Sequence, residues 1–229
     1  MLEVLKTFDI KKNELEKLAS FVGRTGFTKV EKDEFQEVYT YFQQFILYKD
    51  IIPLLSDSNS NYWCMYISGS LRGMVCYLSH DEVNLEPKFH TISNLIEAIE
   101  AHPDAYDFSI LDALEENVFD FPKKDLIDFP EREDIVKALL DEFSHEMDEE
   151  RRQQLAFSIM SLTHHTEIES TIYPFINNED MYIQERAIWF LGFHSYKPAQ
   201  EKLQQLLTTA MPNGKLAAKI ALKKLKLQA

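Results

Sequence analysis

The stretch Glu185-Arg186-Ala187-Ile188-Trp189-Phe190-Leu191-Gly192 belongs to one of three segments in the C-terminal half that repeat each other. The repeat is marked by an alanine every 31 residues and by a large apolar residue four positions after each alanine. These pairs are Ala156 with Met160, Ala187 with Leu191, and Ala218 with Leu222. A small and a bulky residue one turn apart allow a helix to approach its neighbour closely while still filling a core. A period near 31 residues predicts a solenoid of helical pairs, an architecture that binds partners more often than it catalyses.

The composition is that of a globular protein. The 229 residues suit one large or two small domains, and 45% of them are hydrophobic. No stretch of the sequence approaches the ~20 apolar residues that span a bilayer. The segment Met1–Lys6 lacks a basic region followed by an apolar run, so we expect no signal peptide, no membrane partner and a cytoplasmic location.

Cys64 and Cys76 are the two cysteines of the chain, too few for a disulfide scaffold or a zinc cage. They fall in segments that we expect to form neighbouring strands, so a cross-strand disulfide is one alternative. The lack of a secretion signal favours the other alternative, which is two reduced and mostly buried thiols.

Charge is distributed unevenly along the chain. Between Asp81 and Glu150 there are 22 acidic and 5 basic residues, so this segment carries −17 and the remainder +3 of the total formal charge of −14. Such a gradient sets up a field that steers a basic partner to the middle of the chain. It argues against direct binding of nucleic acid, which needs a basic face. The simpler alternative is an acidic surface that only keeps the protein soluble.

Residues 1–102 have the pattern of an α+β domain, a small antiparallel sheet with flanking helices. A helix is predicted from Glu31 to Tyr48, where apolar residues recur at helical spacing. Three strands are predicted at 51–55, 62–67 and 74–78, in runs rich in apolar, aromatic and β-prone residues. Gly69 and Gly73 lie between the predicted strands 62–67 and 74–78, which predicts a hairpin. Ser93 is placed to cap the helix that follows.

Residues 103–130 are acidic but carry too many apolar residues for a disordered linker, so we predict an ordered connector. Residues 131–229 read as a helical repeat domain of three antiparallel pairs. The six helices are predicted at 131–147, 149–163, 167–177, 181–193, 198–209 and 213–227. The third of them begins with Thr166-Glu167-Ile168-Glu169, which has the spacing of a capping box.

Two parts of the chain resemble known families. An apolar-Pro-apolar strand at Ile51–Leu55, the aromatic pair Tyr62-Trp63 and the glycine-led strand ending at His80-Asp81 resemble the SUKH superfamily over about residues 29–101. The helix at Ser93–Ile99 completes that pattern, whereas Tyr48-Lys49-Asp50 replaces the family's Asn-Gly turn. The resemblance implies an interaction module, because bacterial members are largely immunity proteins that neutralise a cognate toxin, often a nuclease. Eukaryotic members act as regulatory interaction modules.

The C-terminal repeats resemble HEAT repeats. The Arg186-Ala187 pair followed by Leu191-Gly192 a turn later matches the second helix of that repeat, and the flanking copies match more loosely. Terminal repeats of a solenoid are expected to be atypical because they cap the stack.

Histidines are the most direct candidates for chemistry. His80-Asp81 follows a predicted strand, where a histidine near a carboxylate could act as a general base, but no nucleophile elbow lies near it. The adjacent rings of His164-His165 would point to different faces of a helix, so we expect this pair to mark a helix end. No metalloprotease, zinc-ribbon or phosphate-loop motif is found in the sequence. We expect no enzyme, no cofactor and no metal site.

The densest acidic patch lies in the connector. Its members are Asp104, Asp107, Asp112, Glu115, Glu116 and Asp120. A solvated face, a surface for a basic protein partner, and binding of Mg²⁺ or Ca²⁺ are three alternatives, although the spacing fits neither a calcium loop nor a two-metal site.

The leading hypothesis is a cytoplasmic immunity protein whose acidic surface binds and blocks a basic toxin domain, for which a nuclease is the natural candidate. The alternative is a HEAT-type scaffold or regulatory module with a non-toxin partner. An enzyme that uses His80 with Asp81 is the third and weakest hypothesis.

Overall fold

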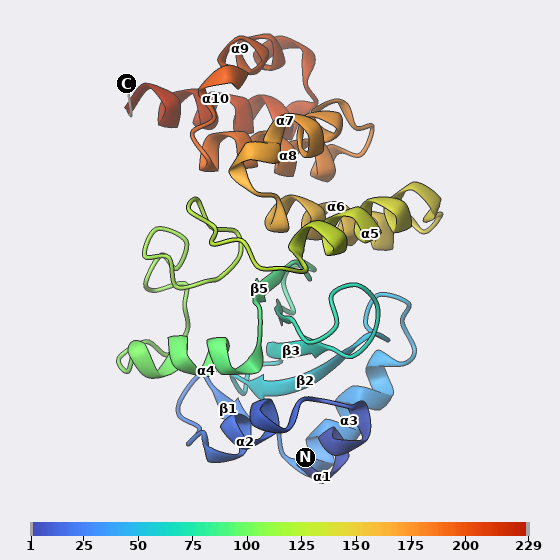
Figure 1. Ribbon diagram of the computed structural model, residues 1–229. Coiled ribbons are helices and arrows are strands. Elements are labelled where there is room, and N and C mark those ends of the chain that lie inside the picture. Colours follow the sequence, from blue (N-terminus) through green and yellow to red (C-terminus); the bar gives the residue numbers. More distant parts are fainter. Residues whose placement is uncertain (1, 228–229) are drawn as a thin grey trace. The chain divides into compact units, whose positions relative to one another are not determined.

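The computed structural model describes residues 2–227 and divides the chain into two compact units, Met1–Lys123 and Lys124–Ala229 (Figure 1). Met1 is the first residue of the predicted α+β domain, and residues 228–229 are the last of the predicted repeat domain. These three residues lie outside the described residues. The first unit holds an antiparallel sheet and the second is mostly helical, so the predicted order of an α+β part followed by helices is confirmed. The division between the units falls inside the predicted connector, 103–130.

The sheet of the first unit is a meander in which each strand pairs with the next, in the order β1-β2-β3-β4-β5. The strands are β1 (Thr28–Lys29), β2 (Ile51–Ser56), β3 (Tyr62–Tyr66), β4 (Val75–Leu78) and β5 (Pro87–Phe89). The three predicted strands are confirmed as β2, β3 and β4, and the β3–β4 hairpin turns through Gly69 and Gly73 at φ of 70° and 89°. Strands β1 and β5 have two and three residues, too few to show a period in the sequence.

Helices of the first unit flank the sheet. They are α1 (Leu2–Leu5), α2 (Lys12–Ser20), α3 (Lys32–Phe42) and α4 (Ile92–Ala101), with a 3₁₀ turn at Lys6–Phe8. The predicted helix from Glu31 to Tyr48 is too long, because beyond Phe42 the chain continues in single turns in which Phe45 N–H donates to Phe42 O and Tyr48 N–H to Phe45 O. The cap of α4 is also corrected. The N-cap residue is Thr91, not Ser93, and the Thr91 Oγ1 accepts from Asn94 N–H at 3.1 Å.

After α4 the chain runs without regular helices or strands to α5, yet its apolar side chains join the core of the first unit. Phe108, Ala113 and Val118 are buried there together with Trp63 and Phe89. The loop at Arg24 holds the start of this segment. The Arg24 guanidinium donates to the carbonyls of Ile99 at 3.2 Å, of His102 at 2.7 Å, and of Ala105. The carbonyls of Ile99 and His102 also accept from the backbone N–H groups of His102 and Ala105, so the guanidinium adds a second hydrogen bond to each.

Helices of the second unit match most of the predicted ranges. They are α5 (Arg132–His145), α6 (Glu149–Leu162), α7 (Ile168–Thr171), α8 (Met181–Phe193), α9 (Gln200–Thr209) and α10 (Pro212–Leu227). The predicted helix 167–177 is wrong. It is broken into a 3₁₀ turn at His165–Glu167, the short α7, and a second 3₁₀ segment at Tyr173–Asn177 that contains Pro174, which cannot donate a helical hydrogen bond. The capping box at Thr166 does not form, because His164 Nδ1 accepts from Thr166 N–H instead.

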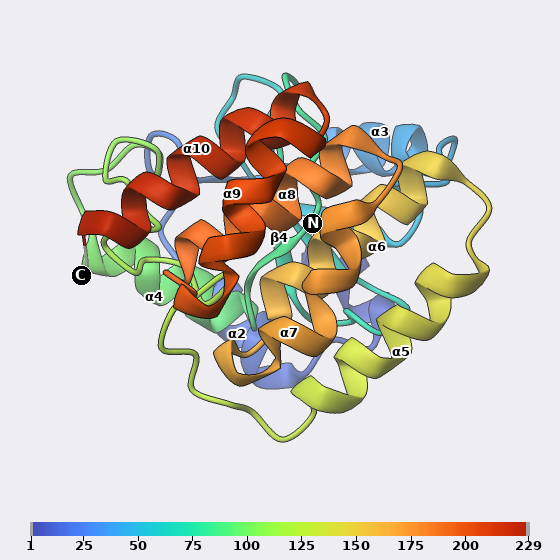
Figure 2. The same cartoon turned by 90° about the horizontal axis from the view of Figure 1, so that it is seen from above.

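The repeated alanines lie on α6, α8 and α10, and Ala156, Ala187 and Ala218 are all fully buried. Helix α8 packs against both α6 and α10, as Figure 2 shows from above. A Cβ added at Gly192 of α8 would lie 2.7 Å from the Cβ of Ala221 on α10, so these two helices meet at a distance that only small residues permit. The period in the sequence therefore marks the helices that contact one another.

Arg132, whose side chain is buried, forms an ion-pair network with two more exposed carboxylates at the start of α5. Its side chain is 2% exposed, with Nε 2.6 Å from Asp128 Oδ1 and Nη1 2.7 Å from Glu167 Oε2. Hydrogen bonds from the guanidinium hold the pKa of Glu167 below its ordinary value of 4.5 and lower that of Asp128 as well. The network joins α5 to the turn before α7.

Gly26 is expected to be the least replaceable glycine of the first unit. It has φ +82°, and an added Cβ would lie 1.5 Å from Tyr106 O, whereas Gly69 has φ +70° with nothing within 4 Å. Gly69→Ala carries only the backbone strain of a left-handed residue, about 1–2 kcal/mol. Gly26→Ala should lower the free energy of unfolding by clearly more. Urea unfolding followed by Trp63 fluorescence in a Trp189→Phe background measures both, and equal losses would contradict the contact with Tyr106.

Glu167→Gln tests the Arg132 network. A carboxylate with a depressed pKa stabilises the fold above its unfolded pKa, near 4.5, and loses that effect as the pH falls through its folded value. The variant should therefore lose about 1–3 kcal/mol at neutral pH. This difference from the wild type should shrink as the pH drops below 4.5. Thermal unfolding followed by circular dichroism measures it, with the exposed Glu169→Gln as control. A pH-independent difference would argue against the ion pair.

Candidate functional site

The six predicted carboxylates all lie on the connector, but the structure sorts them into two groups. Asp107 and Asp120 are half-buried and bind backbone. Asp107 Oδ1 accepts from the N–H groups of Ser109 at 2.7 Å and Ile110 at 3.2 Å. Asp120 Oδ2 accepts from His90 N–H at 2.9 Å, while the backbone N–H of Asp120 donates to Lys88 O at 2.9 Å. These two side chains hold the connector in place, one within a turn and one against the end of β5.

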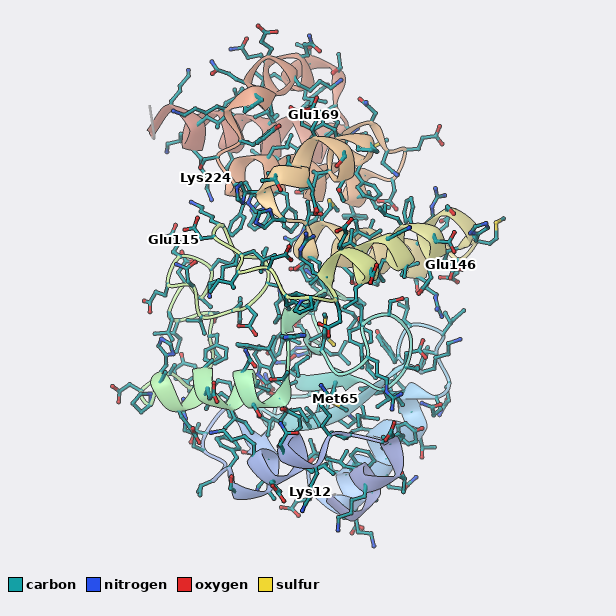
Figure 3. The ribbon with its side chains drawn as sticks, in the orientation of Figure 1. Lys12, Met65, Glu115, Glu146, Glu169 and Lys224 are labelled. Carbon is teal, nitrogen blue, oxygen red and sulfur yellow. The ribbon has the colours of Figure 1, made fainter. Side chains whose placement is uncertain are left out.

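The remaining four are exposed to solvent. Asp104, Glu115 and Glu116, here called the exposed triad, are exposed residues, the side chain of Glu116 by 52%, and Glu115 is labelled in Figure 3. Glu116 lies 4.0 Å from His102 Nε2, at the limit of an ion pair. Asp112 has φ +44°, and its carbonyl accepts from the N–H groups of Glu115 at 2.8 Å and Glu116 at 3.1 Å. The turn that carries most of this charge is thus closed by its own backbone.

A cavity of about 490 Å³ lies in the first unit between the connector and the sheet. Asp107 and Asp112 line it, together with Asp57 from the β2–β3 turn and the aromatic side chains of Trp63 and Tyr77. Burial, followed by the charges of Asp57, Asp107 and Asp81, raises the pKa of Tyr77 to about 12. Asp57 was not among the predicted site residues. In the sequence, Asp57 is marked only as part of the polar turn 56–61. That pattern does not predict that Asp57 lies close to Asp107 and Asp112, which are about fifty residues later in the chain.

His80 lies after β4 as predicted, in an exposed loop. Its Nδ1 is 2.8 Å from Asn61 Oδ1, which also accepts from the His80 N–H, and its Nε2 is 3.2 Å from Asp81 Oδ1. These bonds tie the loop to the β2–β3 turn, and they give His80 a structural role.

Cys64 and Cys76 face each other across β3 and β4, as predicted for neighbouring strands. Both are buried free thiols. Burial raises the pKa of Cys64 well above its ordinary value and that of Cys76 to about 12, so the reactive thiolate is disfavoured.

Among residues 2–227, no group of three or more His, Cys, Asp or Glu side chains is arranged to hold a metal ion. Within the same range no helix is long and apolar enough to cross a membrane. No protein-family model, curated protein or solved structure matches this chain significantly. The SUKH-like and HEAT-like resemblances therefore stay predictions.

The two groups of carboxylates should respond differently to neutralisation. Asp120→Ala leaves the His90 N–H without its acceptor and should cost about 1–3 kcal/mol of unfolding free energy. Asp120→Asn keeps an acceptor oxygen and should recover most of that loss. The variant Asp104→Asn/Glu115→Gln/Glu116→Gln should stay within about 0.5 kcal/mol of the wild type. Urea unfolding followed by Trp63 fluorescence in the Trp189→Phe background measures these differences. A large loss in the triple variant would refute the division into two groups.

Proposed function

We propose that this chain is an immunity-type protein, which binds a basic toxin domain and blocks it through the carboxylates of the connector. The observation that carries the proposal is the fixed presentation of the exposed triad. Asp107, Asp120 and Phe108 anchor the same segment to its own backbone and to the sheet core. A surface that is ordered before binding loses less conformational entropy on association, so its charges contribute more to affinity.

Electrostatics favour a basic protein as the partner. Exposed carboxylates attract a cationic groove over roughly a Debye length, about 8–10 Å at physiological salt, and speed the encounter. The same charges repel phosphates, so a nuclease toxin would be bound at its nucleic-acid groove while nucleic acid itself would not be bound. This role requires no cofactor and no catalytic residue of the chain, and we place it in the cytoplasm.

The order of elements also supports the proposal. A helix, a run of antiparallel strands and a second capped helix follow one another in α3, β2, β3, β4, β5 and α4, the order that the SUKH resemblance implies with β5 added at the end of the sheet. For the second unit we propose a short HEAT-like solenoid, supported by the packing of α8 against both α6 and α10 and by the buried alanine in each of these helices.

One observation favours the alternative, a HEAT-type scaffold with a non-toxin partner. Leu216 and Ile220 lie one turn apart on α10 and are 59% and 46% exposed. Apolar side chains at this spacing offer a site for an apolar partner. Binding there would depend on hydrophobic contact and would resist salt, unlike binding to the exposed triad.

The proposal is tested by capture followed by growth rescue. The tagged chain is used at low salt to recover partners from its own cells, and any basic domain recovered is then produced from an inducible promoter in a bacterial host. Co-production of the wild-type chain should restore growth, and Asp104→Asn/Glu115→Gln/Glu116→Gln should restore it at least about tenfold less well, because three charge-assisted contacts are lost.

A matched control removes the same charge elsewhere in the first unit. Asp33→Asn/Glu37→Gln/Glu97→Gln changes three exposed carboxylates on α3 and α4 and should rescue growth as the wild type does. Full rescue by the exposed-triad variant would eliminate the electrostatic mechanism. Recovery only of a non-toxic partner that resists high salt would favour the scaffold.

A further inference from the structure

The cavity between the connector and the sheet has aromatic walls. Trp63 and Tyr77 lie with ring centroids 4.9 Å apart, and Phe108 packs against Trp63 at 5.7 Å. Phe119 closes another part of the wall, 5.9 Å from Phe108. Tyr77 and Phe119 are only half-buried, so part of their rings faces the cavity. Aromatic faces carry negative electrostatic potential and attract cations.

Three carboxylates surround this aromatic wall. Asp57 comes from the β2–β3 turn, and Asp107 and Asp112 come from the connector. Lys88 is the basic residue of the lining, and its Nζ lies 2.5 Å from Oε1 of the fully buried Glu86, so its charge is matched within the protein. Lys88 Nζ also lies 5.4 Å from the centroid of the Phe119 ring, so this ring already has a cation beside it. The lining therefore has a surplus of negative charge.

We propose that this cavity receives the side chain of an arginine from the protein partner. The inference rests on the proposed function, because the cavity joins the exposed triad through Asp112, whose carbonyl accepts from Glu115 and Glu116. An arginine there would enter as an anchor at the centre of a charged interface.

The chemistry of guanidinium fits the cavity better than that of ammonium. Guanidinium is planar and weakly hydrated, so it stacks on an aromatic ring while its edge donates to carboxylates in pairs. Lysine presents a compact, strongly hydrated charge that gains less from such a wall. A volume of about 490 Å³ is ample for one side chain. Anions are excluded by the three carboxylates.

Fluorescence of Trp63 reports occupancy of the cavity. The chain has two tryptophans, so Trp189→Phe leaves Trp63 as the only one. The full-length variant is titrated with N-acetyl-arginine methylamide, with N-acetyl-lysine methylamide, and with the neutral isostere N-acetyl-citrulline methylamide. We expect a saturable change with the arginine compound in roughly the millimolar range, as for a ligand of this size. The lysine compound should bind more weakly and the citrulline compound should give no saturation.

Two substitutions place the binding in the cavity. Asp112→Asn keeps the left-handed turn, which asparagine tolerates, and should weaken arginine binding about tenfold by removing one charge-assisted contact. Tyr77→Leu removes part of the aromatic wall and should also weaken it. Glu97→Gln, an exposed carboxylate on α4 outside the cavity, should leave it unchanged. Equal responses to arginine and citrulline, absence of saturation, or unaltered binding to Asp112→Asn would each overturn the inference.

The inference and the proposed function fail separately. Asp104, Glu115 and Glu116 do not line the cavity, so the growth test can succeed while the titration fails. In that outcome the toxin is bound by the exposed triad without an arginine anchor. If the titration succeeds and no toxin is recovered, the arginine site belongs to another basic partner.

Discussion

The contact between Trp63 on β3 and Phe108 on the connector is the interaction on which the acidic site of the first unit depends. Their ring centroids are 5.7 Å apart, and Phe108 also packs against Phe27 at 5.1 Å and Phe89 at 6.1 Å. Burying one such side chain contributes about 1.5–3 kcal/mol. This gain offsets the repulsion among the carboxylates of the same segment. An acidic stretch without regular secondary structure thereby acquires a fixed conformation.

Fixing the segment divides its carboxylates by role. Asp107 and Asp120 bind backbone N–H groups, whereas Asp112 and the exposed triad face solvent. The sequence could predict the patch as a whole, because it is the densest run of acidic residues, but it could not predict this division. Asp120 binds the N–H of His90, thirty residues earlier, and such a bond leaves no local pattern. The position of Asp57 was unpredictable for a similar reason. The sheet brings the β2–β3 turn, which carries Asp57, beside the connector, and no local pattern in the sequence shows this.

The fold was predictable wherever a segment is long and its periodicity is clear. Strands β2, β3 and β4 are buried apolar or aromatic runs, and the 31-residue period located α6, α8 and α10. Prediction failed where tertiary contacts decide. The helix α3 ends at Phe42, whose ring packs against that of Tyr48 at 5.5 Å with the two planes tilted by 47°, and the chain continues in single turns. The predicted helix 167–177 breaks around Pro174, a residue that the prediction did not take into account.

The salt dependence of partner binding tests the central claim most directly. The dissociation constant of the complex with the recovered basic domain is measured from low to high salt, for the wild type and for Asp104→Asn/Glu115→Gln/Glu116→Gln. If the exposed triad provides the binding energy, wild-type affinity falls steeply as salt rises and the variant binds more weakly with a shallower slope. Equal affinities with equal slopes would show that the partner binds elsewhere and would contradict the account.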